Sequence, residues 1–308
     1  MVSPATHPSL GRNIQGPSLI RIPDWVEAPL GRYYLYFADH KGAYIRLAYA
    51  NDLCGPWTVH PPGSLQLAES RFPTEPPEVP EELMKRIEER AAELMLPHGL
   101  LEEVTTPHVA SPDVHAVDGR IIMYYHGLEG PAFQATRVAT SKDGIRFESQ
   151  PQILGKTYFR AFAHAEHVYA LAMPGQLYRS TDGLADFETG PLLFNPDMRH
   201  AALLRRGQTL HVFWTQVGHA PERILWSTID LSRDWALWSA SDPVEVLRPE
   251  RPWEGADAPR EPSMRSVAYG HVNQLRDPAV YQEEGRTFLL YAVAGESGIA
   301  IAELFFEA

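Results

Sequence analysis

The stretch SPDVHAVDGRIIMYYHG at residues 111–127 decides the fold class of this chain. It reads as a short strand of alternating apolar residues, a turn that ends in Gly-Arg, and a second strand rich in Ile and Tyr. The same order of features occurs in GPSLIRIPDWVEAPLGRYYLYFADH at residues 16–40 and in DPAVYQEEGRTFLLYAVAGE at residues 277–296. Each copy therefore predicts an antiparallel hairpin with a short connection.

Looser copies of this hairpin at residues 159–176 and 199–218 bring the count to about five. The segment after each hairpin also repeats as a strand, a turn built on Asp with Gly or Ser, and a strand that begins with an aromatic residue, as in TRVATSKDGIRFES at residues 136–149. A unit that recurs every 40 to 50 residues or so indicates a repeat architecture, and four strands per unit are typical of propeller blades. We predict an all-β, five-bladed β-propeller that residues 1–308 form as a single domain.

The last unit, IAIAELFFEA at residues 299–308, holds the third strand of its blade and no fourth. A blade without its outer strand has an open edge, which another segment has to cover. We therefore expect the segment before Gly16 to supply the missing strand and close the ring.

One segment departs from the β pattern. Residues 76–96 place Leu83, Ile87, Ala91 and Leu94 at helical spacing, with Glu, Lys and Arg between them. We predict one amphipathic helix over about residues 79–95, inserted between blades one and two. Packing on the side of the ring, a lid and a dimer contact all stay open as its role. A second, proline-rich insertion spans residues 248–275.

The bulk properties exclude several classes of partner. A formal net charge of -12 argues against a nucleic-acid backbone or an anionic membrane surface. No apolar run is long enough to span a bilayer and residues 1–7 do not resemble an export signal, so we expect a cytoplasmic location. The one cysteine, Cys54, leaves no partner for an intramolecular disulfide. The sequence requires no cofactor, contains no short metal-ligand motif, and leaves a central metal ion and an oligomeric state open.

Candidate site residues follow from the geometry of a blade. The starts of the inner strands and the loops between second and third strands lie on one face, where all blades converge on the axis. The catalytic candidates on this face are Asp39, His40, Asp113, Asp277 and Glu296. The substrate-binding candidates are His108, His126, Arg160, Arg199, His200, Gln216, His271 and Arg276. Other polar residues on the same face are Ser111, Glu129, His219, Glu222 and Arg223.

Three of these candidates are arginines at equivalent or near-equivalent entry positions of consecutive blades. Arg160, Arg199 and Arg276 therefore predict a ring of guanidinium groups near the axis. Guanidinium binds carboxylate, sulfate or phosphate through two parallel hydrogen bonds. The alternative is ion pairing between blades, for instance with Asp113 or Asp277, and both interpretations stay open.

Short motifs resemble those of a known enzyme family. ASPDVHAVDGRIIMYYHG at residues 110–127 resembles the blade-two signature of family 43 glycoside hydrolases, and GPSLI at residues 16–20 resembles their blade-one Asp-Pro-Ser-Val. RDPAVY at residues 276–281 resembles the Arg-Asp-Pro motif of the related invertase-like enzymes. The resemblance implies a five-bladed propeller and an inverting mechanism with an aspartate base, an assisting aspartate and a glutamate acid.

The resemblance is incomplete at the acids. The assisting aspartate maps to Asp113, but the base maps to Gly16 and the acid maps to or next to Arg160. Glycine and arginine cannot replace these acids, so a non-standard site is expected. The related anhydrogalactosidases, which are similar in fold, imply a histidine acid. The candidates for the base are then Asp39, Asp277 and Glu296, and those for the acid are His40, His126 and His200.

Three function classes remain open, with glycosidase-like hydrolysis of a small carbohydrate favoured and an anionic or modified sugar as one option. In the second class, a lyase acting on a uronate, a neutral imidazole removes a proton while arginines hold the carboxylate. The third class is a non-catalytic propeller that binds sugar.

Overall fold

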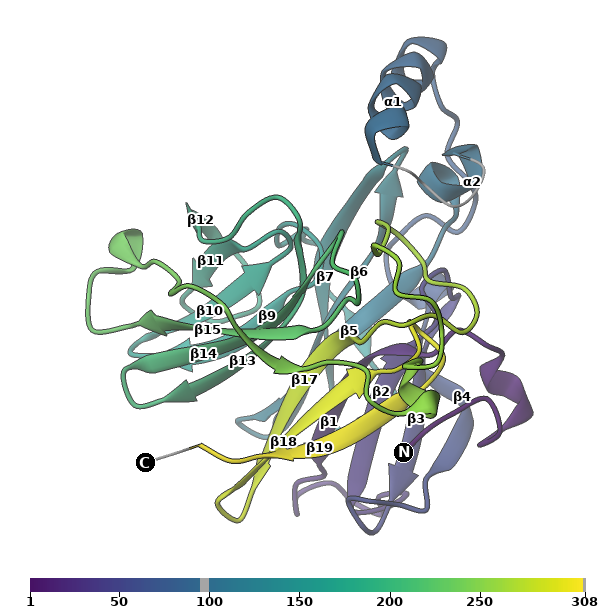
Figure 1. Ribbon diagram of the computed structural model, residues 1–308. Helices are drawn as coiled ribbons and strands as arrows, with labels where there is room; N and C mark the ends of the chain where they lie inside the picture. Colours follow the sequence, from purple (N-terminus) through teal and green to yellow (C-terminus); the bar gives the residue numbers. More distant parts are fainter. Residues whose placement is uncertain (95–99, 307–308) are drawn as a thin grey trace.

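The computed structural model of the chain describes residues 1–94 and 100–306 and shows five antiparallel sheets arranged in a ring (Figure 1). Strands within each sheet follow one another in chain order. The predicted all-β five-bladed propeller is therefore confirmed, and the assignment of residues 1–308 to a single domain stays a prediction.

Each of the first four blades has four strands, and the fifth has three. Blade one contains β1 (Gln15–Arg21), β2 (Tyr33–Ala38), β3 (Tyr44–Ala50) and β4 (Thr58–Gln66), and blade two contains β5 (Val109–Val117), β6 (Arg120–Gly130), β7 (Phe133–Ser141) and β8 (Glu148–Ser149). Blade three contains β9 (Arg160–His164), β10 (His167–Ala172), β11 (Gln176–Ser180) and β12 (Glu188–Leu192), and blade four contains β13 (Met198–Arg206), β14 (Thr209–Gln216), β15 (Ile224–Asp230) and β16 (Val244–Leu247). Blade five contains β17 (Arg276–Glu283), β18 (Arg286–Ala292) and β19 (Ile299–Leu304).

The second strands of the blades are rich in aromatic residues because both of their faces are buried. All residues of β2, with the sequence YYLYFA, are buried. Tyr33, Leu35 and Phe37 pack in a cluster with blade five, whereas Tyr34 and Tyr36 pack in a cluster with blade two. Similar clusters fill the other junctions between neighbouring blades. A strand between two neighbouring blades has no solvent face, which removes the polar residues that a half-exposed strand would carry.

Four inner strands share a backbone irregularity at their start. The register of each hairpin shifts there, around a residue of positive φ: Gly16 (62°), Ser111 (48°), His200 (31°) and Asp277 (46°). A bulge of this kind re-aims the side chains beside it. The equivalence of Gly16, Ser111 and Asp277 in the sequence repeat is therefore an equivalence of backbone conformation. A β-carbon on Gly16 would approach Ser111 Cα to 3.1 Å, so the two inner strands are close here.

The N-terminal segment covers the open edge of blade five, but not as a strand. Val2 and Ile299 exchange two backbone hydrogen bonds of 3.2 and 2.8 Å, and Ile14 N donates to the carbonyl of Glu296 at 2.6 Å. Between these contacts the chain forms a short 3-10 helix, η1 (Pro8–Leu10), whose Leu10 is buried with Val2 and Ile14. The expected closing segment is thus in place, while the expected outer strand is reduced to two isolated bridges, one from Val2 to Ile299 and one from Ile14 to Ser297.

Helices lie outside the ring of strands. The predicted helix is α1 (Glu81–Leu94), and residue 95 of the prediction lies outside the described residues. A second helix, α2 (Leu100–Thr105), was not predicted. Figure 1 shows α1 extending away from the blades, which is not the packing expected of a helix on the side of the ring. The remaining 3-10 helices are η2 (Leu67–Glu69), η3 (Trp235–Leu237) and η4 (Pro252–Glu254). No helix in the described residues is long and apolar enough to cross a membrane.

Ring closure by Val2 gives a stability prediction. Val2→Asp should lower the free energy of unfolding by roughly 2–4 kcal/mol, because it places a carboxylate in an apolar cluster. Urea unfolding followed by circular dichroism measures this change. Ser3→Asp is the matched control, since Ser3 is the next residue and is exposed. Equal stability of the two variants would show that the segment does not close the ring.

Candidate functional site

A cavity of about 480 Å³ opens on the predicted face of the propeller. Its wall combines the loop between β2 and β3, helix α2, the entry to β9, the start of β13 and the second insertion. The residues that carry chemistry in this wall are His40, Glu103, Lys156, Tyr158, Arg199, His200, Arg265 and Ser266.

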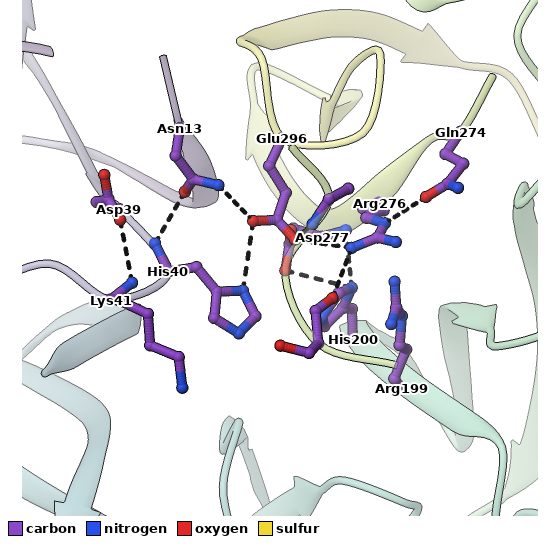
Figure 2. A network of polar contacts seen from close by, with 12 residues as sticks. Asn13, Asp39, His40, Lys41, Arg199, His200, Gln274, Arg276, Asp277 and Glu296 are labelled. Atoms are coloured by element: carbon purple, nitrogen blue, oxygen red, sulfur yellow. Dashed lines mark hydrogen bonds and ion pairs between the residues drawn. The ribbon is translucent and has the colours of Figure 1, made fainter. Parts of the chain in front are cut away.

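His40 is backed by a buried carboxylate. Its Nδ1 lies 3.3 Å from Glu296 Oε2, and the Glu296 side chain is completely buried. Asn13 fixes both residues, since its amide donates to Glu296 Oε2 at 2.7 Å and its carbonyl oxygen accepts from His40 N at 2.8 Å (Figure 2). Asn13 therefore holds the backbone of His40 and the carboxylate of Glu296 together at the cavity wall.

His200 is backed by a second carboxylate. Its Nδ1 lies 3.3 Å from Asp277 Oδ1 and also accepts a 3.4 Å hydrogen bond from Asp277 N. Both residues are at the bulges of neighbouring inner strands, which brings blades four and five together (Figure 2). Neither carboxylate oxygen of Asp277 has a hydrogen-bond partner among the described residues. The cavity wall thus presents two imidazoles, each with a buried carboxylate behind it, and we call these pairs the two dyads.

The two buried carboxyl groups have pKa values shifted in opposite directions. Burial raises the pKa of Asp277 to about 7, and the negative charge of Glu296 adds to the rise. Burial alone would also raise the pKa of Glu296, but His40, Arg276 and Asn13 outweigh it and lower that pKa. Burial lowers the pKa of His200 well below 6.5, and the nearby arginines lower it further. At neutral pH Glu296 is therefore ionised and His200 is neutral, and Asp277 titrates closer to neutrality than an ordinary aspartate does.

The three predicted arginines are engaged in ion pairs and backbone contacts. Arg199 binds Glu222 through two hydrogen bonds of 2.9 Å. Arg276 donates to Glu296 at 2.8 Å and lies 3.4 Å from Glu222. Arg160 donates to two backbone carbonyls and lies 3.6 Å from Asp113. These contacts match the ion-pair alternative, and the predicted ring is divided because Arg160 lies apart from the other two.

Two further predicted histidines form part of a column of buried rings. His108 and His126 have ring centroids 5.9 Å apart, His126 lies 4.4 Å from Tyr158, and Tyr158 lies 4.9 Å from His200. Burial lowers the pKa of His108 to about 3 and that of His126 well below 6.5. Both rings are therefore neutral at physiological pH, and the column reaches His200 through Tyr158.

Asp113 lies away from both dyads. It lines a different cavity together with Arg21 and Glu283, which end β1 and β17 at the opposite face of the ring. The placement of Asp113 on the same face as His40 was therefore wrong. The reason is the bulge: Asp113 comes two residues after Ser111, and the chain has by then advanced along the axis.

Three other candidates lie at the periphery. Asp39 accepts from Lys41 N and pairs with Arg46, Gln216 binds Asn195 and His219, and the half-exposed His271 binds Asp257 at 2.6 Å. His271 also lines a neighbouring cavity of about 710 Å³ formed by the second insertion. Among the described residues, no hydrogen bond or ion pair joins the side chain of any of the three to a dyad.

Several residues of the site were missed from the sequence: Asn13 and Tyr158, which contact the dyads, and Glu103, Lys156, Arg265 and Ser266, which line the cavity. Asn13 precedes the first repeat, so the alignment of repeats gave it no equivalent. Tyr158 stands beside Phe159 and looked like a core aromatic. Its positive φ of 63° just before β9 marks it in the structure, and no sequence signal at a tyrosine predicts that conformation.

Comparison with known sequences identifies one relative. None of the known protein-family models matches this chain. Uncharacterized protein R118 of Acanthamoeba polyphaga mimivirus is 34% identical over 320 residues, which cover 95% of this chain and 83% of the viral protein. The chain belongs to the family of this viral protein.

Comparison with solved structures gives the fold relatives of this family member. A family 43 β-xylosidase/α-arabinofuranosidase from a compost microbial metagenome superposes with a TM-score of 0.61 at 11% identity, covering 97% of this chain and 93% of the enzyme. The α-L-arabinanase of Cellvibrio cellulosa gives 0.55 at 13% identity, covering 96% and 93%. At these identities the likeness shows the fold, and the predicted resemblance to family 43 propellers is confirmed at that level.

The buried pairing of Glu222 gives a second stability prediction. Glu222→Gln should lower the free energy of unfolding by roughly 3–5 kcal/mol. The substitution removes the carboxylate with which the buried guanidinium groups of Arg199 and Arg276 pair. Glu245→Gln is the matched control, since Glu245 also bridges two arginines, Arg223 and Arg248, at a partly exposed position. Glu245→Gln should lower the free energy of unfolding by only roughly 0–1 kcal/mol. Equal losses would mean that the buried network is not a stabilising centre.

The raised pKa of Asp277 gives a pH prediction. Between its usual value of 3.8 and about 7, the folded chain binds this proton more tightly than the unfolded chain does. The contribution of Asp277 to stability therefore falls as pH rises through that window. Relative to Asp277→Asn, the wild type should lose melting temperature steadily between about pH 4 and 7, the interval between the two pKa values, and change little above it.

Differential scanning calorimetry across that range measures the effect. Asp118→Asn is the control, because Asp118 is an exposed aspartate of similar positive φ. A constant difference in melting temperature between wild type and Asp277→Asn would contradict the shift.

Proposed function

We propose that this chain is a glycoside-hydrolase-like enzyme in which His40 and His200 carry out acid–base chemistry on a carbohydrate. The observation that carries the proposal is the arrangement of the two dyads on one cavity wall, each with an imidazole–carboxylate distance of 3.3 Å. Perturbed titratable groups in a cavity are typical of functional sites.

The electrostatics assign different roles to the two imidazoles. His200 is neutral at pH 7, and in the tautomer whose Nδ1–H faces Asp277 Oδ1 its Nε2 is free to take a proton from an attacking water. Ionised Glu296 lies 3.3 Å from Nδ1 of His40, and this imidazole is suited to give a proton to the leaving oxygen. Asp277 holds the His200 ring and balances the charge that develops on it. Hydrolysis is complete when the hydroxyl joins the sugar and the proton joins the leaving group.

The chemistry of the wall favours a substrate with a negative group. Lys156 and Arg265 line the same cavity as the dyads, and Glu103 is its one acidic counterpart among the described lining residues. The fold relatives supply the first neutral ligands to compare, because one solved family 43 enzyme is in complex with xylotriose and another with arabinohexaose. An acidic xylo- or arabino-oligosaccharide is therefore the first substrate class to test.

A lyase reaction on a uronate is the second candidate. A neutral His200 beside Lys156 and Arg265 favours it, because a base and a carboxylate-binding cation would then share one cavity. The two reactions differ in their products: elimination gives an unsaturated sugar that absorbs ultraviolet light, and hydrolysis does not.

Substitution of the imidazoles tests the proposal. His40→Asn and His200→Asn should each lower kcat on a hydrolysed oligosaccharide roughly 10²- to 10⁴-fold, because each removes a proton-transfer group and keeps much of its shape. Product analysis by chromatography, with ultraviolet detection of unsaturated ends, measures turnover and separates the two reactions. His167→Asn is the control, since His167 starts β10 at the opposite face. Sugar binding without any turnover would contradict the proposal and leave a binding propeller.

A further inference from the structure

The opposite mouth of the ring holds a second cavity that the two dyads do not use. Its volume is about 560 Å³, within the range of roughly 300–1,000 Å³ typical of small-molecule sites. Segments of all five inner strands line it, so it lies on the axis, at the ends where the turns to the second strands begin. The charged residues that line it are Arg21, Asp113, His115, Arg160, Arg205 and Glu283.

Positive charge exceeds negative charge in this cavity. Asp113 has two basic partners, His115 at 2.8 Å and Arg160 at 3.6 Å. Glu283 is also bound by two, Arg21 at 3.1 Å and Arg32 at 3.3 Å. Arg205 adds a further cation, which donates to the carbonyl of Gly207. A cationic axial cavity stands out in a chain of net charge -12.

A buried guanidinium at this site retains unused donor capacity. The Arg160 side chain is 5% exposed, its Nε donates to Ala201 O at 2.8 Å, and its Nη1 donates to Pro112 O at 2.6 Å. These two bonds fix the group. Its Nη2 has no acceptor among the described residues and is not fully enclosed by protein atoms. Because Arg160 lines the cavity, this nitrogen faces it. A fixed guanidinium with a free N–H edge is suited to an oxyanion.

We infer that the axial cavity between Arg160, His115 and Arg205 binds a small oxyanion, a carboxylate or a phosphate, independently of the cavity on the other face. The anion would accept from Arg160 Nη2 at the inner end and from Arg205 at the mouth. His115 also lines the cavity, with its Nε2 2.8 Å from Asp113 Oδ2. This site is separate from the proposed acid–base chemistry, and its test does not depend on turnover.

Isothermal titration with sodium phosphate and with sodium malonate, at constant ionic strength set by sodium chloride, tests the inference. One of the two anions should bind at a single site. Comparison of the two titrations shows whether the site prefers a phosphate or a carboxylate. Arg205→Ala and Arg160→Gln should each weaken binding roughly tenfold or more, because each removes a charged donor. Arg205 is exposed, so Arg205→Ala tests the site even where Arg160→Gln fails to fold. Arg233→Ala, at an exposed arginine of another turn, should leave binding unchanged.

The pH dependence gives a second readout. Burial would lower the pKa of His115, but the charge and hydrogen bond of Asp113 outweigh it and raise that pKa, with Arg160 opposing. Anion binding should therefore weaken as pH rises through this raised pKa, and His115→Asn should remove the dependence. Arg21, Arg205 and Glu283 also line the cavity, and the histidine is the group among them suited to titrate near neutrality. Absence of binding for both anions, or equal weakening by Arg233→Ala or His200→Asn, would overturn the inference.

Discussion

The five inner strands meet around the axis without a shared backbone ladder, because each sheet in the described part of the chain belongs to one blade. Side chains therefore join the blades there. Ser18 Oγ accepts from Val114 N at 2.9 Å, Asp113 from Ala161 N at 2.7 Å, and His200 from Asp277 N at 3.4 Å. A polar residue at the start of an inner strand thus both closes the ring and lies where a ligand can reach the axis, so structure and chemistry use the same positions.

Burial of charge at the axis affects both the stability of the ring and the acid–base chemistry of the site. Arg199 and Arg276 share Glu222, and Arg276 continues to Glu296. Such a network is stabilising when every member is paired and costly when one is removed, because the remaining charges lie away from water. Burial favours a raised pKa for both Asp277 and Glu296, and the charges and hydrogen bonds around Glu296 separate the two values by lowering its pKa. The acid–base properties of the dyads therefore depend on arginines that do not themselves bind substrate in our proposal.

The sequence predicted well wherever a local pattern repeats. The hairpin motif identified five blades, and it aligned Gly16, Ser111 and Asp277 before their common positive φ was known. It also singled out His40, His200, Asp277 and Glu296, which form the dyads. It did not separate Asp113 from them, since an advance of two residues along an inner strand changes the cavity that a side chain enters. It missed Asn13 and Tyr158, whose importance comes from neighbours distant in sequence.

What the sequence by itself determined is the number of blades, the order of their strands and the residues near the axis. These features follow from hydrophobic alternation and turn chemistry, which act over a few residues. The tertiary structure alone decided which carboxylate lies behind which imidazole, that the arginines are paired, and that the axis has two separate cavities. The physical reason is that these contacts join different blades, so their distances depend on how the blades pack.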